Sequence, residues 1–359
     1  MATLWVGSRK GLFRYDDHGS GWQSAGKPAF IAAPVTAVLD DARDGSIYVS
    51  LYHGHFGCKL HRSDDRGATW VELAAPAYPQ SDDPQAAALE FVWCFASGGR
   101  DEPGVIWAGT LPGGLFRSAD KGSSWVLCEA LWNRPERLKW FGAGYDHAGI
   151  HSILVDPDDS RHVVVAVSIG GVWITRDGGE SWVLGGHGLR SDYVPPGQEQ
   201  DPELQDAHLI MASGADFNRI WCQHHCGIFV SDDGGMQWRE SLAVKPSAFG
   251  FAVAAHPGDR DRAWFAPAVK DECRLPVDGK LVVTETRDGG VSFTVQDQGL
   301  PAVECYDLIY RHALVVDRSG ERLAIGSTTG GLWVSGDGGV DWQLLSAHLP
   351  PIAALTFAP

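Results

Sequence analysis

Fourteen histidines are spread through the chain, and several lie in short glycine-containing segments where side chains could meet. His53 and His55 occur in SLYHGHFGC, and His224 and His225 occur in WCQHHCGIF. Three or four imidazoles around one cavity would suit a divalent ion such as Zn²⁺, Mn²⁺ or Ni²⁺. The predicted metal ligands are His55, His151, His208 and either His224 or His225.

A polar channel filled by hydrogen-bonded histidines is the alternative to a metal centre. The chain has no HExxH segment and no paired CxxC segments, which would identify a metal site directly. Its seven cysteines are scattered, and Cys222 and Cys226 are expected to be small buried side chains rather than ligands. Metal binding therefore depends on whether the histidines converge.

A charged segment, VKDECRLPVDGKLVV, begins at Val269 and interrupts an otherwise strand-like stretch. Cations in such a loop could hold a carboxylate or a phosphate, although a solvated surface loop is the alternative. The predicted catalytic residues are Lys270, Glu272, Asp146 and Tyr306. The predicted substrate-binding residues are Arg9, Arg274, Arg311, His312 and His53.

An eight-residue repeat indicates the scaffold that positions these side chains. Copies of Ser/Thr-x-Asp-x-Gly-x-x-Trp/Phe begin at Ser63, Ser118, Thr175, Ser231, Thr286 and Ser335, and a degenerate copy, YDDHGSGW, begins at Tyr15. Successive closing aromatic residues are separated by between 48 residues (Trp22 to Trp70) and 57 residues (Trp125 to Trp182). A repeat of this length predicts stacked β-sheet units. Within each copy, Asp can accept backbone hydrogen bonds and Gly can adopt positive φ, so the box itself is expected to be structural.

Each period contains four short strand-like stretches, which predicts an all-β fold. We expect a single seven-bladed β-propeller over residues 1–359, with four-stranded antiparallel blades. The chain starts at TLWVGS, a second strand, and IAALTFAP at 352–359 would supply the missing innermost strand. Blade 1 is therefore expected to combine residues 3–25 with 352–359 and to close the ring.

These repeats resemble those of the Asp-box, or BNR-repeat, β-propellers, which include sialidases, xyloglucan-cleaving glycosidases, sortilin-type receptor domains and a photosystem assembly factor. The chain is most similar to uncharacterised intracellular glycosyl-hydrolase-like members. The resemblance covers the whole chain and implies the fold. A sialidase would also carry a Phe/Tyr-Arg-Ile-Pro motif before the first box, where this chain has LFRYDD.

In such a propeller, the loops that lead into the innermost strands emerge on the same face as the turns between second and third strands. The predicted site residues lie in these two kinds of segment and should converge at one mouth of the central channel. Loops on a rigid scaffold commonly carry function.

The formal net charge of -16 disfavours binding to nucleic acid or to an anionic membrane. The N-terminal residues resemble strand and turn rather than an export signal, so we expect a cytoplasmic protein. The favoured hypothesis is a hydrolase or lyase acting on a small polar or anionic substrate, assisted by a divalent metal. The alternatives are a non-catalytic ligand-binding or assembly propeller and a glycoside hydrolase. The sequence does not specify the oligomeric state.

Overall fold

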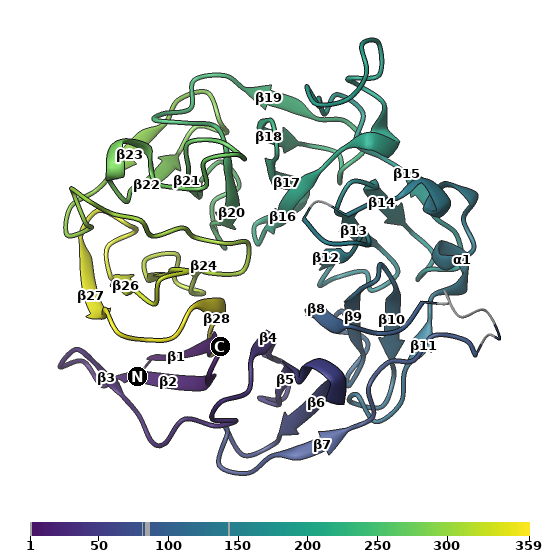
Figure 1. Ribbon diagram of the computed structural model, residues 1–359, viewed down its shortest axis with the longest axis horizontal. Helices are drawn as coiled ribbons and strands as arrows, with labels where there is room; N and C mark the ends of the chain where they lie inside the picture. The colour runs from purple at the N-terminus through teal and green to yellow at the C-terminus, as the bar shows by residue number, and fades with distance from the viewer. Residues whose placement is uncertain (1, 81, 83–86, 143) are drawn as a thin grey trace.

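The computed structural model describes residues 2–80, 82, 87–142 and 144–359. Seven four-stranded antiparallel sheets are arranged as blades around a central axis (Figure 1). This confirms the predicted seven-bladed β-propeller.

Each blade runs from an innermost to an outermost strand. Blade 1 contains β28 (Ile352–Phe357), β1 (Ala2–Ser8), β2 (Gly11–Asp17) and β3 (Trp22–Ser24). Blade 2 contains β4 (Val35–Asp40), β5 (Ile47–Tyr52), β6 (Cys58–Ser63) and β7 (Val71–Leu73). Blade 3 contains β8 (Phe91–Ser97), β9 (Ile106–Leu111), β10 (Leu115–Ser118) and β11 (Val126–Leu127). Blade 4 contains β12 (Ile150–Val155), β13 (Val163–Val167), β14 (Gly171–Thr175) and β15 (Val183–Leu184).

The remaining three blades follow the same order. Blade 5 contains β16 (Ala207–Ser213), β17 (Asp216–His224), β18 (Gly227–Ser231) and β19 (Arg239–Ser241). Blade 6 contains β20 (Gly250–Ala255), β21 (Ala263–Pro267), β22 (Val283–Thr286) and β23 (Thr294–Gln296). Blade 7 contains β24 (Leu314–Val316), β25 (Leu323–Gly326), β26 (Leu332–Ser335) and β27 (Trp342–Ser346).

The ring is closed by the pairing of its two ends. Strand β28 pairs antiparallel with β1, and Val6 faces Leu355 in the register. The N- and C-termini therefore lie close together, on the same blade (Figure 1). As predicted, the C-terminal strand completes blade 1, and closure removes the open sheet edges that favour aggregation.

The repeated octapeptides form the turns between the third and fourth strands. In blade 4, Asp177 Oδ1 accepts a hydrogen bond from the Ser181 backbone N–H at 2.9 Å, and its Oδ2 accepts one from the Ser181 hydroxyl. Gly179 has a φ of +98°, which glycine adopts without strain. The closing Trp182 is buried between blades 3 and 4. These contacts confirm the structural role predicted for the aspartates.

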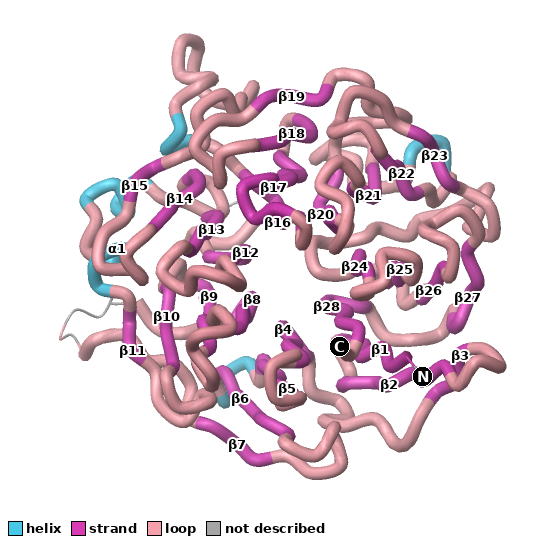
Figure 2. The backbone as a smooth tube through the Cα atoms, turned by 180° about the vertical axis from the view of Figure 1, so that it is seen from behind, coloured by secondary structure: helices cyan, strands magenta, loops and turns pink. Residues whose placement is uncertain are grey.

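The hydrophobic core lies between neighbouring blades. Trp107 of β9 and Trp173 of β14 belong to one buried cluster that joins blades 3 and 4. Short helices occur only in connecting loops of the described residues (Figure 2): η1 (Gly54–Phe56), α1 (Glu129–Trp132), η2 (Pro135–Lys139), η3 (Pro202–Leu204) and η4 (Val277–Gly279). Within the described ranges, none of the helices has the length and apolar character needed to cross a membrane.

Candidate functional site

A cavity of about 1210 Å³ opens at one end of the propeller axis. Its wall includes residues from turns between second and third strands: Arg9, Ile169, His225, Arg274 and Thr328. It also includes residues from segments that lead into innermost strands: Pro34, Glu90, Tyr145, Asp206, Tyr306 and Arg311. These are the two kinds of segment that the sequence placed on one face.

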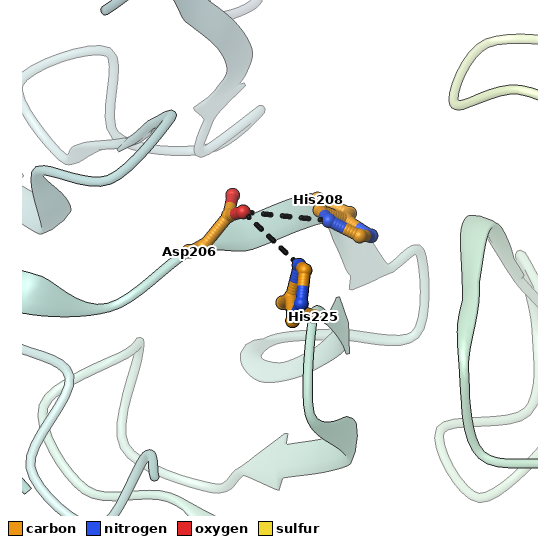
Figure 3. A group of neighbouring side chains, drawn as sticks. All are labelled: Asp206, His208 and His225. Carbon is orange, nitrogen blue, oxygen red and sulfur yellow. Dashed lines mark ion pairs between the residues drawn. The ribbon is translucent and has the colours of Figure 1, made fainter. Parts of the chain in front are cut away.

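Three wall residues form a compact group of potential metal ligands. Asp206 immediately precedes β16, His208 lies within β16, and His225 follows β17 in the same blade. One ligand atom from each lies within 4.8 Å of the others. Figure 3 shows both imidazoles lying beside the Asp206 carboxylate. A carboxylate with two imidazoles is a donor set that several divalent metals accept.

The contacts within this group leave the Asp206 carboxylate poorly satisfied. Asp206 Oδ2 lies 3.4 Å from His208 Nε2 and 3.5 Å from His225 Nδ1, which is long for a hydrogen bond. Asp206 is only 1% exposed, and among the described residues neither of its carboxylate oxygens has a hydrogen-bond partner. A buried carboxylate is costly unless it is paired, so a protonated His225, a bound cation or ordered water would stabilise this one.

The tautomer of His208 is a second, independent indication of a metal-binding role. His208 Nδ1 lies 2.6 Å from the carbonyl oxygen of Gly250, so Nδ1 carries the proton and donates it. In the neutral ring, Nε2 then presents a lone pair toward the carboxylate of Asp206. A backbone carbonyl that fixes one ring nitrogen while the other stays free is typical of a metal-binding histidine. His208 also stacks on Phe251, with ring centroids 4.5 Å apart, which fixes its orientation.

The protonation of the three side chains follows from burial and mutual charge. Burial opposes ionisation of Asp206, but its contacts with His208 and His225 and the positive charge of Arg311 outweigh burial and hold the pKa of Asp206 below its usual range. Burial lowers the pKa of His208. Burial also acts to lower the pKa of His225, but its contact with Asp206 prevails and raises that pKa. The group is thus built around an ionised Asp206 and a neutral His208.

Arg311 supplies a buried cation beside this group. Its Nε donates a hydrogen bond of 2.7 Å to the backbone oxygen of His208. The guanidinium lies 5.1 Å from the ring centroid of Trp93 and 5.6 Å from that of Phe251. Among the described residues, no carboxylate lies within ion-pairing distance of it, although it lines the cavity. Its two terminal nitrogens are therefore suited to a bidentate contact with an anion.

Several predicted substrate-binding residues do reach the wall. The structure places Arg9, Arg274, Arg311 and His312 there, together with Tyr306, which was predicted to be catalytic. Arg274 is paired with Asp271 at 2.5 Å, so its charge is partly compensated. His312 Nε2 lies 2.9 Å from the backbone oxygen of His151. Binding roles for these residues remain predictions.

The predicted four-histidine set is not assembled. His55 lies on η1, which turns outward after β5, and its side chain is exposed against Phe56. His151 is fully buried, with Nδ1 3.0 Å from the Ser152 hydroxyl. His224 is the last residue of β17 and packs against Phe229, whereas its neighbour His225 reaches the cavity. Of the predicted ligands, only His208 and His225 lie together in a compact group, and they do so with Asp206.

Four other predicted site residues also lie away from the axial cavity. Lys270 and Glu272 form an exposed ion pair with each other, at 3.5 Å. Asp146 is exposed in the segment before β12. His53 instead lines a separate hollow of about 430 Å³ near η1. The charged insert does reach the wall, through Asp271 and Arg274 rather than through Lys270 and Glu272.

Many residues of the axial cavity wall were not predicted from the sequence. Asp206 is absent from the predicted site, although its spacing of two residues from His208 in an extended segment places both side chains on one side. Aromatic wall residues were also missed: Tyr52, Phe91, Trp93, Tyr145, Tyr193, Phe251 and Tyr310. Most of them lie at or near a strand end on the same face, whereas Tyr193 lies in the long loop between β15 and β16.

No family model matches the chain. A probable oligoxyloglucan-reducing end-specific xyloglucanase of Neosartorya fischeri is 28% identical over 207 residues, covering 52% of this chain and 23% of the relative. The chain therefore spans less than a quarter of that relative's length.

Two solved structures share the fold. The crystal structure of an ancestral GH74 enzyme has a TM-score of 0.58 and 16% identity, covering 99% of this chain and 40% of the other. YCF48 bound to D1 peptide has a TM-score of 0.53 and 14% identity, covering 93% of this chain and 87% of the other. The chain is thus a seven-bladed β-propeller with GH74-like structural neighbours and a xyloglucanase as a distant sequence relative.

Proposed function

We propose that the protein is a hydrolase or lyase that acts on a small anionic substrate in the axial cavity, assisted by a divalent metal. The observation that carries the proposal is the buried Asp206 carboxylate, which faces the Nε2 lone pair of His208 and has no hydrogen-bond partner among the described residues. The distant similarity to a xyloglucanase supports hydrolase-like chemistry.

The proposed metal ligands are Asp206, His208 and His225, and Zn²⁺, Mn²⁺ and Ni²⁺ all accept such donors. When bound, the ion would supply Lewis acidity toward a substrate oxygen or a water molecule. The carbonyl of Gly250 and the ring of Phe251 hold His208 in place for this role. The chain thus contributes three ligands and leaves the remaining coordination positions to water or substrate.

Arg311 would bind and orient the anionic group of the substrate. Its guanidinium is held by the His208 carbonyl and by two aromatic rings, so little side-chain entropy is lost on binding. Tyr306 is the one predicted catalytic residue on the wall, and we assign it the transfer of a proton through its hydroxyl.

Metal analysis of dialysed protein tests the centre. We expect one bound divalent ion per chain in the parent and its loss in Asp206→Asn, which keeps the side-chain shape. Asp271→Asn, which changes a wall acid already paired with Arg274, should retain the metal. Equal metal content in all three proteins would contradict the proposed ligands.

Product analysis tests the reaction class. Metal-loaded protein would be incubated with a panel of small carboxylate-bearing esters, lactones and glycosides. A hydrolase would incorporate ¹⁸O from labelled water, and a lyase would release an unsaturated product detectable by its ultraviolet absorbance. If the parent and Asp206→Asn turn over the panel equally, the proposed enzyme centre is wrong.

One observation favours a second candidate, a glycoside hydrolase. The wall carries several aromatic side chains, as sugar-binding clefts do, and the distant relative is a xyloglucanase. Glycoside hydrolysis would need a pair of carboxyl groups, and Glu90, Asp206 and Asp271 are the acids on the wall. Turnover of a glycoside after complete metal removal, abolished by Glu90→Gln, would support this candidate over the metal-assisted one.

A further inference from the structure

Tyrosine is concentrated around the mouth of the axial cavity. Five of the eight tyrosines in the chain line it: Tyr52, Tyr145, Tyr193, Tyr306 and Tyr310. Four of them are between 39% and 65% exposed, which is high for so large a side chain in a folded protein. Exposed aromatic residues gathered at one opening indicate a binding surface rather than core packing.

Neighbouring aromatic rings hold these tyrosines in position. Tyr145 lies edge-on against Trp93, with ring centroids 5.1 Å apart, and Tyr52 lies edge-on against Phe91 at 6.0 Å. Tyr310 is held in the same way against Phe251 at 5.0 Å. The rings are therefore ordered before any ligand arrives, which reduces the entropy lost on binding.

A tyrosine ring offers an apolar face and a hydroxyl at its tip. A ligand that matches a set of such rings must present both C–H faces and hydroxyl groups. Sugars have this composition, because a pyranose ring has an apolar face surrounded by hydroxyl groups. A purely aliphatic ligand would leave the tyrosine hydroxyls without partners, at a cost in free energy.

The unpaired cation adjoins this rim. Trp93 contacts Tyr145 on one side, and the Arg311 guanidinium lies over its ring. A sugar resting on Tyr145 would thus lie next to the terminal nitrogens of Arg311, which have no carboxylate partner among the described residues. The charge of Asp206 acts on Arg311 from beyond ion-pairing distance, and a neutral sugar would leave the terminal nitrogens without an anionic partner, whereas an acidic sugar would supply one.

We propose that the substrate is an anionic sugar, with its pyranose ring against Tyr145 and its charged group on Arg311. This inference rests on the proposed function in one respect: both assign the anionic group of the substrate to Arg311. It requires neither the metal nor a particular reaction. A carboxylate and a phosphate would both supply the negative charge.

The test measures sugar binding to chelator-treated protein by isothermal titration calorimetry. Because the protein carries no metal in this experiment, its outcome does not depend on whether the proposed metal centre exists. The probes are D-glucuronate, D-glucose 6-phosphate, D-glucose and an acidic tripeptide. We expect at least one anionic sugar to bind at least tenfold more tightly than D-glucose, and the two anionic probes separate a carboxylate from a phosphate preference.

Variants connect the binding to the two residues. Tyr145→Leu should weaken the preferred anionic sugar at least tenfold, whereas Phe56→Leu, at an exposed ring outside the cavity, should not. Arg311→Gln, which removes the charge, should abolish most of the preference for charged over neutral sugar while circular dichroism confirms folding. Equal affinity for D-glucose and both anionic sugars, or tighter binding of the tripeptide, would overturn the proposal. So would unchanged binding by Tyr145→Leu.

Discussion

His312 should make the stability of the protein sensitive to mild acid. Its ring lies on the cavity wall, and burial lowers the pKa of His312 to about 4, with the charge of Arg311 acting in the same direction. The hydrogen bond to the His151 backbone oxygen opposes this shift without reversing it. In the unfolded chain the imidazole titrates near its ordinary value of 6.5.

The direction of the change in stability with pH follows from the number of protons bound by the folded and the unfolded chain. Between pH 6.5 and pH 4 the unfolded chain binds a proton at this position and the folded chain does not, so the free energy of unfolding falls as the pH falls. With about 1.4 kcal/mol for each pKa unit, the difference between 6.5 and about 4 corresponds to at most roughly 3.5 kcal/mol. Solvent in the cavity reduces this figure, because the ring is not fully buried.

Urea unfolding at pH 7.5 and at pH 4.5 measures the effect. His312→Asn should lose 1–3 kcal/mol less stability than the parent between these two pH values, as a rough estimate from the same linkage. Histidines that do not interact with His312 contribute equally to both proteins and cancel, whereas His151, which contacts it, is coupled to the substitution. The exposed His348→Asn serves as the control and should follow the parent. A parent and a His312→Asn variant with the same pH dependence would refute the linkage argument.

Three further predictions concern the metal, the repeat turns and ring closure. A divalent ion at about 100 times its dissociation constant should raise the melting temperature of the parent by roughly 4 °C, but not that of Asp206→Asn, as calorimetry would show. Asp177→Ala should lower the melting temperature without changing metal content. Because its hydrogen bonds hold the pKa of Asp177 at about 2, the stabilisation it provides in the parent should disappear as the pH falls through that value. Leu355→Ala in β28, at a site only 4% exposed, should destabilise the protein by roughly 2–5 kcal/mol in chemical unfolding.

The fold could be predicted because its information is local and repeated. Each octapeptide specifies one turn through its own hydrogen bonds, and the seven copies count the blades. The C-terminal strand was predictable because the first blade lacked an innermost strand. The face on which the site lies also followed from the strand order alone.

The depth and direction of individual side chains were not predictable in this way. His55 and His225 occupy corresponding turns in blades 2 and 5, but η1 carries His55 outward, whereas the short turn after β17 brings His225 to the cavity. His224 and His225 are adjacent, but His224 ends β17 and packs against Phe229, whereas His225 lies in the following turn and lines the cavity. Whether a side chain faces the cavity can depend on ending a strand one residue earlier or later, and the sequence pattern does not locate strand ends that accurately.

The candidate site also depends on contacts between segments that are distant in the sequence. Arg311 lies on the segment leading into blade 7, and the His208 backbone oxygen that it contacts lies in blade 5. The neighbouring His312 receives support from β28, because the Leu355 N–H donates to the His312 backbone oxygen at 2.8 Å. Pairing of β28 thus helps to hold the segment that carries the cation beside the proposed metal ligands. The same segment is also tied to blade 5 by the hydrogen bond from Arg311 to His208, and Phe251 of blade 6 contacts both side chains, so the candidate site depends on three neighbouring blades and on the strand that closes the ring.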